Sequence, residues 1–353
     1  MKFDLYKKRF LLCFIVLISF VAYSQQTNVH TPVLKKYNNA LHLFNDKAYA
    51  AAAQSFVTII EKTPNNYIVK SNAAYYHALC AIKLNQPKAV KKLLTFITEN
   101  PHSTEKNNAC FTVANYYFAN KKITDALQWY QQVNHDLIAE KDRKEIRFKI
   151  GYAYLEGNKL HAAKKEFLPL INDPIYGNKA RYYYGYIAYK LEDYEIAEST
   201  LKEIADHDLF RVEISYYLLD INFKTGKFEH CIDVGKKLLK TVQGKQRSDI
   251  SKIIGESYFN IKKYKEAIPY LKKYTGKKGK WNNTDFYQLG TAYYQQSDFE
   301  NAISYFNKII DEKNDVAQNA YYRLGECYLH LQQKTAALNA FKSASEMNFN
   351  EDI

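Results

Sequence analysis

The sequence has little glycine and proline, 12 and 7 of its 353 residues. Both residue types interrupt helices and recur in turns, so their scarcity excludes a turn-rich β protein and a low-complexity chain. Hydrophobic residues make up 47% of the chain, which is enough for a packed core. The composition therefore predicts long helices joined by short turns.

Cysteine and histidine are too few and too scattered to indicate a metal site. Four cysteines follow residue 24, at Cys80, Cys110, Cys231 and Cys327, and no two have CxxC spacing. The histidines form no HxxxH or HExxH pattern, and no GxSxG segment is present. Zinc sites and nucleophilic active sites need such arrangements. We therefore predict buried free thiols, no metal, no cofactor and no enzymatic activity.

Long apolar runs are lacking beyond the N-terminus. Residues 10–22 form an apolar run of 13 residues, and Ala-Tyr-Ser at 22–24 is a small-x-small cleavage signal before Gln25. Positive charges precede this run at Lys2, Lys7, Lys8 and Arg9. This order predicts a secretory signal peptide over 1–24, because a permanent anchor needs roughly 20 apolar residues. An uncleaved anchor is the alternative.

The net charge is strongly positive, at +13 for the whole sequence and +10 without residues 1–24. A basic protein attracts nucleic acid, but an exported protein rarely meets it, so we predict no nucleic-acid partner. The lysines occur in adjacent pairs, which indicates a solvated outer surface. Weak attraction to acidic membrane or polysaccharide surfaces is the functional alternative, and membrane association is at most peripheral.

A unit of 34 residues recurs along the chain, and its last copy begins at Gln318. That copy carries its small and large apolar residues at Tyr321, Leu324, Gly325, Tyr328, Ala337, Phe341 and Ala344. The spacing is typical of two helices that touch closely at Gly325 and Ala337. In these residues the chain resembles the tetratricopeptide repeat (TPR) family.

Similar units begin near residues 33, 71, 107, 144, 178, 212, 248, 283 and 318. The resemblance implies an all-α protein, a right-handed α-solenoid of nine stacked helix-turn-helix repeats over 33–350, after a linker over 25–32. The unit at 212 departs from the pattern, with Leu219 and Asn222 where Gly and Tyr are usual, and is predicted to be a weak interface. The end near residue 350 indicates either a piece of a longer repeat protein or a face covered by another subunit.

The resemblance also implies that the first helix of each repeat lines a concave groove. The fifth place of the unit is aromatic in eight of nine repeats, and near the middle of the chain the ninth place is tyrosine in two successive repeats and an acid in the next two. The predicted groove residues are Phe111, Phe148, Tyr152, Tyr182, Tyr186, Tyr189, Tyr216, Asp220 and Glu256, with Glu145, Glu156, Glu213 and Asp249 adding negative charge. Packing between repeats would also explain these aromatic residues.

An aromatic and acidic groove suits an extended peptide that carries Lys or Arg, because rings supply anchors and cation–π contacts. Family members that grip acidic C-terminal tails need Lys and Asn at the fifth and ninth places, and only Asn115 fits. We therefore predict a non-catalytic protein-protein interaction scaffold, exported to the periplasm or the outer membrane of a Gram-negative bacterium. The alternative is a factor that binds or assembles a cell-wall or exported polysaccharide, because tyrosine rings also stack on sugars.

Overall fold

A computed structural model describes residues 32–64, 68–310 and 312–350 of the chain. The predicted signal peptide (1–24) and all of the predicted linker (25–32) except Pro32 lie outside these residues, and both stay predictions. Within them there are eighteen α-helices, two short 3-10 helices and a single β-bridge between Lys277 and Lys280. The prediction of an all-α protein is confirmed. None of the described helices is long and apolar enough to cross a membrane.

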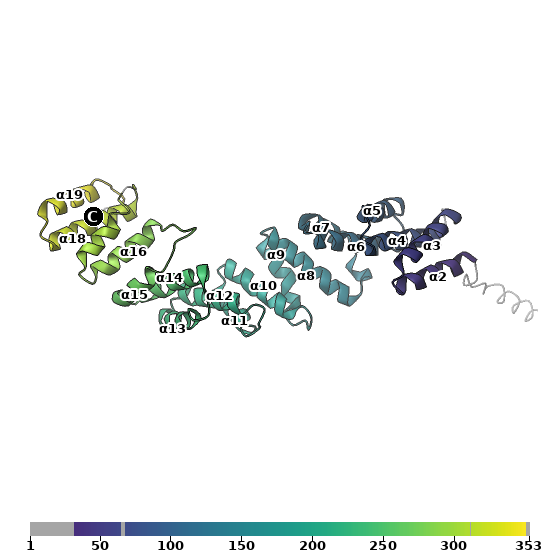
Figure 1. The fold of residues 1–353 in the computed structure, drawn as a ribbon, viewed down its shortest axis with the longest axis horizontal. Helices are drawn as coiled ribbons and strands as arrows, with labels where there is room; N and C mark the ends of the chain where they lie inside the picture. Colours follow the sequence, from purple (N-terminus) through teal and green to yellow (C-terminus); the bar gives the residue numbers. More distant parts are fainter. Residues whose placement is uncertain (1–31, 65–67, 311, 351–353) are drawn as a thin grey trace, which may run out of the picture. The chain divides into compact units, whose positions relative to one another are not determined.

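The chain divides into two compact units, residues 1–162 and 163–353 (Figure 1). The first contains α2 (Pro32–Asn45), α3 (Tyr49–Lys62), α4 (Ile68–Lys83), α5 (Ala89–Glu99), α6 (Lys106–Ala119), α7 (Ile123–Tyr130), η2 (His135–Leu137) and α8 (Glu140–Glu156). Helix α9 (Leu160–Phe167) contains the boundary. The second contains η3 (Leu168–Leu170), α10 (Gly177–Lys190), α11 (Tyr194–Lys202), α12 (Arg211–Lys224), α13 (Phe228–Leu238), α14 (Gly244–Asn260), α15 (Tyr264–Leu271), α16 (Asn283–Tyr294), α17 (Phe299–Phe306), α18 (Asp315–His330) and α19 (Lys334–Ser345).

Consecutive helices pack as pairs where a small residue faces a large one. A Cβ added at Gly325 of α18 would lie 2.5 Å from Phe341 of α19, and one added at Gly290 of α16 would lie 2.7 Å from Phe306 of α17. Both glycines therefore permit a close approach that a larger residue would block. This is the packing predicted for the last repeat.

In the pair of α12 and α13 the small residue and the large residue exchange places. Leu219 occupies the usual glycine position and is fully buried, while Gly235 stands where the other pairs of the second unit have leucine or phenylalanine. A Cβ added at Gly235 would lie 2.6 Å from Ile254 of α14 and 3.7 Å from Leu219. Gly235 therefore permits a close approach chiefly of Ile254, and the weak interface expected for this repeat stays a prediction.

The turn between the two helices of each pair has a common backbone conformation. Fourteen residues after each predicted repeat start lies a residue with φ between 49° and 76°, namely Lys47, Asn85, Lys121, Asn158, Glu192, Gly226, Lys262, Ser297 and Gln332. The next backbone N–H bonds to a carbonyl five residues earlier, as Asp193 does to Ala188 at 2.9 Å. These turns are Schellman motifs, which satisfy the last carbonyls of the first helix. Only Gly226 adopts this conformation without a steric cost.

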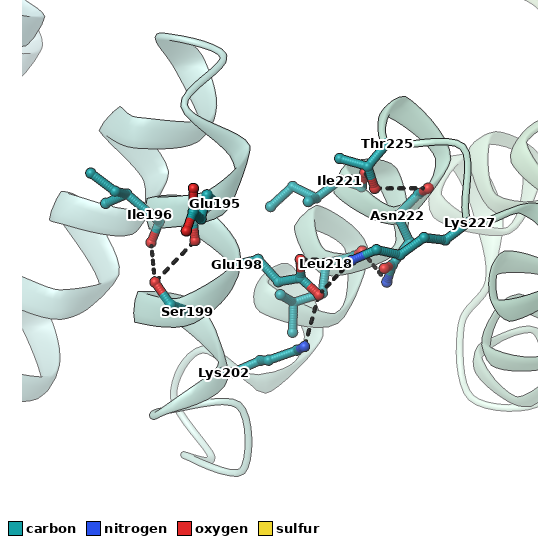
Figure 2. Close-up of polar contacts among 10 residues, drawn as sticks. All are labelled: Glu195, Ile196, Glu198, Ser199, Lys202, Leu218, Ile221, Asn222, Thr225 and Lys227. Atoms are coloured by element: carbon teal, nitrogen blue, oxygen red, sulfur yellow. Dashed lines mark hydrogen bonds and ion pairs between the residues drawn. The ribbon is translucent and has the colours of Figure 1, made fainter.

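Polar contacts join α11 to the pair of α12 and α13 (Figure 2). The Glu198 carboxylate accepts hydrogen bonds from Lys202 Nζ at 2.7 Å and Lys227 Nζ at 2.9 Å. These two hydrogen bonds hold the pKa of Glu198 below its usual range. In the same view the buried Asn222 donates its amide to the Leu218 carbonyl at 2.8 Å. The polar residue in the usual tyrosine position is therefore satisfied.

A tyrosine and carboxylate site on helices α10, α12 and α14

The predicted tyrosines of α10 lie on one face of this helix, because their spacing of four and three residues matches a helical turn. Tyr182 stacks on Phe210, with ring centroids 4.4 Å apart, and lies parallel to Tyr186 at 6.5 Å. Tyr217 of α12 contacts Tyr186 at 5.5 Å and Tyr189 at 5.1 Å. All five rings are only half-buried. They form a continuous aromatic surface that both packs helices together and faces solvent.

Two carboxylates adjoin this surface. Tyr189 donates its hydroxyl hydrogen to Asp220 Oδ2 at 2.6 Å. Burial raises the pKa of Tyr189, and the hydrogen bond and charge of Asp220 raise it further. Burial also raises the pKa of Tyr216 to about 12, with added contributions from the charges of Asp220 and Asp249. The charges of Asp220 and Asp249 therefore both act on Tyr216.

No ion pair within the described part of the chain neutralises Asp220 or Asp249 at 4.0 Å or closer. Among the described residues, the Asp220 side chain bonds only to the neutral Tyr189 hydroxyl. Glu213, on the first turn of α12, is exposed and is likewise in no ion pair. These three acids leave uncompensated negative charge beside the tyrosines.

The predicted acid Glu256 lies in a different setting on α14. Lys252 Nζ donates to Asp285 Oδ1 at 2.5 Å, lies 3.7 Å from Glu256 Oε1 and lies 4.5 Å from the centre of the Tyr274 ring. Burial lowers the pKa of Lys252, but the Asp285 hydrogen bond and the Glu256 charge outweigh it and raise that pKa. Burial raises the pKa of Glu256, against the opposing charges of Lys252 and Lys224. Glu256 is therefore already compensated inside the protein.

The three remaining predicted residues, Phe111, Phe148 and Tyr152, belong to the first unit and are half-buried. Phe111 packs against the core of α6, α7 and α8. Tyr152 meets Phe118 edge-on, with ring centroids 5.9 Å apart. Part of the Phe111 and Tyr152 rings therefore serves packing within this unit.

Glu145, one of the two predicted acids of the first unit, also has an internal cation, whereas Glu156 is exposed. Lys149 Nζ donates to Glu145 Oε1 and to Asn115 Oδ1, the latter at 2.7 Å, and lies 5.3 Å from the centre of the Phe118 ring. Asn115 also accepts the Tyr130 hydroxyl hydrogen at 2.6 Å. Asn115 was the one residue that fitted the pattern of family members that bind acidic C-terminal tails. Its side chain is already used in hydrogen bonds within the protein.

The structure brings together five of the predicted residues, namely Tyr182, Tyr186, Tyr189, Tyr216 and Asp220. Glu256 differs from them because a lysine of the protein, Lys252, lies beside it. Sequence reasoning missed Tyr217, which touches two of the predicted tyrosines, and Asp285, which holds Lys252. Lys252 itself was visible as the one non-aromatic residue at the fifth place of the repeat. That exception could have indicated an internal counter-charge.

The described residues contain no group of three or more His, Cys, Asp or Glu side chains able to hold a metal ion. The four cysteines of the described chain are buried and unpaired, as predicted. Burial raises the pKa of Cys80 and of Cys231 to about 11. Because the thiolate is the reactive form, these thiols are inert at neutral pH.

Comparison with known proteins agrees with the helix pairing. Residues 253–276 and 287–346 match tetratricopeptide repeat family profiles, and no curated protein matches the chain. The C-terminal part of a TPR repeat-containing protein from Cytophaga hutchinsonii is 19% identical, with a TM-score of 0.53 over 69% of this chain and 97% of that one. MamA 41-end from Desulfovibrio magneticus RS-1 is 22% identical over 50% of this chain and 97% of that one, but its TM-score of 0.42 is too low for comparison. The two matched segments show tetratricopeptide repeats at residues 253–276 and 287–346, and the paired helices of the rest of the described chain are consistent with the same repeat.

Proposed function

We propose that the chain is a non-catalytic scaffold of the cell envelope that binds a protein partner through the tyrosine and carboxylate site of α10, α12 and α14. TPR domains typically bind protein partners, and TPR scaffolds are generally non-catalytic. The observation that carries the proposal is the pairing of a half-exposed tyrosine surface with Asp220 and Asp249, two acids that form no ion pair with any residue the structure describes. Such a site suits a lysine or arginine side chain.

The chain's own lysines illustrate the chemistry that we propose for the partner. Lys252 lies over Tyr274 and against Asp285, and Lys149 lies over Phe118 and against Glu145. A cation over a ring face beside a carboxylate gains both cation–π and charge-assisted contacts. A partner's cation placed among Tyr216, Asp220 and Asp249 would make the same contacts in a site that the protein leaves open.

The location is part of the proposal and rests on residues 1–24, which lie outside the described residues. A signal peptide there would send the chain to the periplasm or the outer membrane of a Gram-negative host. Intact-mass measurement of the protein from its own host tests this. The proposal expects a chain that begins at Gln25, and a mass that retains residues 1–24 would contradict it.

Affinity capture from an envelope extract tests the binding role. The full chain as bait should retain a protein that Tyr186→Ala retains at least roughly fivefold less, since an aromatic anchor is worth more than about 1 kcal/mol. Raising the salt should weaken retention, because salt screens exposed charges. Lys179→Ala is the matched control, since Lys179 is exposed at the start of the same helix, whereas Lys190 Nζ lies 5.7 Å from the centre of the Tyr186 ring.

The same capture experiment separates the proposal from its alternative. Retention of a polysaccharide in place of a protein would favour the factor that binds or assembles an exported glycan. A protein partner that ignores both Tyr186→Ala and salt would place the binding surface elsewhere on the molecule.

A further inference from the structure

A cavity of about 580 Å³ lies among α12, the end of α13 and the start of α14. Its apolar lining comes from Val212, Tyr216, Leu238, Val242 and Ile250. Val242 and Ile250 are buried, whereas Val212 is 46% exposed. The volume falls in the range of small-molecule sites, roughly 300 to 1,000 Å³, which are likewise lined mainly by apolar side chains.

The two aliphatic hydroxyl groups that line the cavity are already used within the protein. Ser215 Oγ donates to the Arg211 carbonyl at 2.7 Å, and Thr241 Oγ1 donates to the Leu238 carbonyl at 3.0 Å. The charged residues of the lining are Arg211 and Lys237, and none of the lining residues that the structure describes is acidic. The cavity therefore combines an apolar interior with two cations.

Neighbouring acids do not cancel these cations. Asp208 lies 3.9 Å from Arg211, but the Asp208 and Arg211 side chains are 95% and 62% exposed, so solvent and salt screen this pair. Asp220 and Asp249 act on Tyr216 without lining the cavity. They favour a ligand whose uncharged part lies against Tyr216 and whose negative end lies at Arg211 and Lys237.

We infer that this cavity binds a small apolar carboxylic acid, with the hydrocarbon part against Val242 and Ile250 and the carboxylate at Arg211 and Lys237. The inference is independent of the proposed partner site. That site would bind a cation through carboxylates, whereas the cavity would bind an anion through basic side chains. It assigns a ligand of defined chemistry to a region that the partner proposal does not use, apart from the shared wall at Tyr216.

Three probes with the same eight-carbon chain test the inference: octanoate, octanamide and octylammonium. Titration of each into the full chain, followed by methyl NMR of Val212, Leu238, Val242 and Ile250, reports both affinity and place. We expect octanoate to bind with a Kd of about 1 to 6 mM, the level that a usual ligand efficiency gives for its ten heavy atoms. Octanamide should bind roughly fivefold more weakly, and octylammonium more weakly still.

Substitutions at the exposed cations separate charge recognition from folding. The double variant Arg211→Gln with Lys237→Gln should bind octanoate no better than octanamide and should melt like the wild-type protein, because both side chains reach solvent. Lys240→Gln, exposed nearby but outside the lining, is the control and should leave the preference unchanged.

Three results would overturn the inference. The first is no methyl shift with octanoate up to about ten times the expected Kd. The second is equal binding of octanoate and octylammonium, which would show an apolar void without charge selection. The third is an octanoate preference that survives the double variant. Because none of these measurements uses the tyrosine surface, their failure would leave the proposed partner site untouched.

Discussion

Two groups of carboxylates on the second unit differ in whether the chain supplies a cation for them. Glu256 and Asp285 share Lys252, which donates to Asp285 and lies over the ring of Tyr274. Asp220 and Asp249 lie beside Tyr216 and are in no ion pair within the described chain. The first group forms a structural ion pair. The second group is available to bind a cation from a partner.

The difference teaches that acidity along a repeat groove is a poor guide to its binding site. Glu256 and Asp220 occupy the same ninth place in adjacent repeats, and both were predicted to bind a partner. The side chain of Glu256 is 15% exposed and faces Lys252. An acid that already has its cation offers a partner little, because the partner would have to displace an internal contact.

The largest effect should come from a residue next to Asp220 in the chain. Leu219→Ala should lower the free energy of unfolding by about 3 kcal/mol, because Leu219 is fully buried and fills the space opposite Gly235. Chemical denaturation measures this. Asp220→Asn is the matched control and should change stability by about 0.5 kcal/mol or less, because the amide oxygen can still accept the Tyr189 hydroxyl hydrogen. Equal losses would show that Asp220 is a structural residue.

The second effect concerns the compensated carboxylates. Lys252→Met should cost roughly 2 to 3 kcal/mol, because it leaves Asp285 and Glu256 without their cation, and Asp285 is only 6% exposed. Lys252 opposes the burial that raises the pKa of Glu256, so its removal should raise that pKa further. The folded variant then takes up a proton at higher pH, and its deficit should shrink as the pH falls.

Glu256→Gln on the Lys252→Met background supplies the control. It removes one of the two uncompensated charges and should recover part of the lost stability at neutral pH. A Lys252→Met variant as stable as the wild-type protein would show that the ion pair has no structural role. The contrast between the two groups of carboxylates would then disappear.

The smallest effect should come from Glu198, a carboxylate with two lysines (Figure 2). Its lowered pKa means that it stabilises the fold above the ordinary value of 4.5, and that this contribution is lost as the pH falls further. Glu198→Gln should therefore cost roughly 0.5 kcal/mol at neutral pH and nothing in acid, because Lys202 and Lys227 are exposed. Thermal unfolding across this pH range measures the difference. A cost that persists in acid would have a cause other than charge.

The repeat pattern predicted the helix pairs because their packing is local. Gly325 and Phe341 mark their own contact through size and spacing. The exchange of Leu219 and Gly235 could also have been predicted, because both residues depart from the usual pattern within one repeat. Comparison of the two positions with each other would have revealed it. The Schellman turns could not be predicted, because Lys, Glu, Ser and Gln adopt the left-handed conformation there without a glycine to mark it.

The candidate site was predictable only in part. Spacing placed Tyr182, Tyr186 and Tyr189 on one face of α10, and that is where they lie. The pairing of Lys252 with Asp285 joins residues 33 apart in different repeats, so it depends on how neighbouring helices pack. Which acid is paired with a lysine therefore depends on the fold, and it cannot be predicted from the positions of the acids in the sequence.

Titration with a short acetylated peptide tests the proposed binding site most directly. The peptide carries two lysines, and its twin carries norleucine at both positions. The proposal predicts that the full chain binds the lysine peptide and that Asp220→Asn with Asp249→Asn weakens this binding roughly tenfold, or about 1.4 kcal/mol. Glu256→Gln should change it less than about twofold. Equal affinity for the two peptides, or a larger loss from Glu256→Gln than from the Asp220 and Asp249 variant, would contradict it.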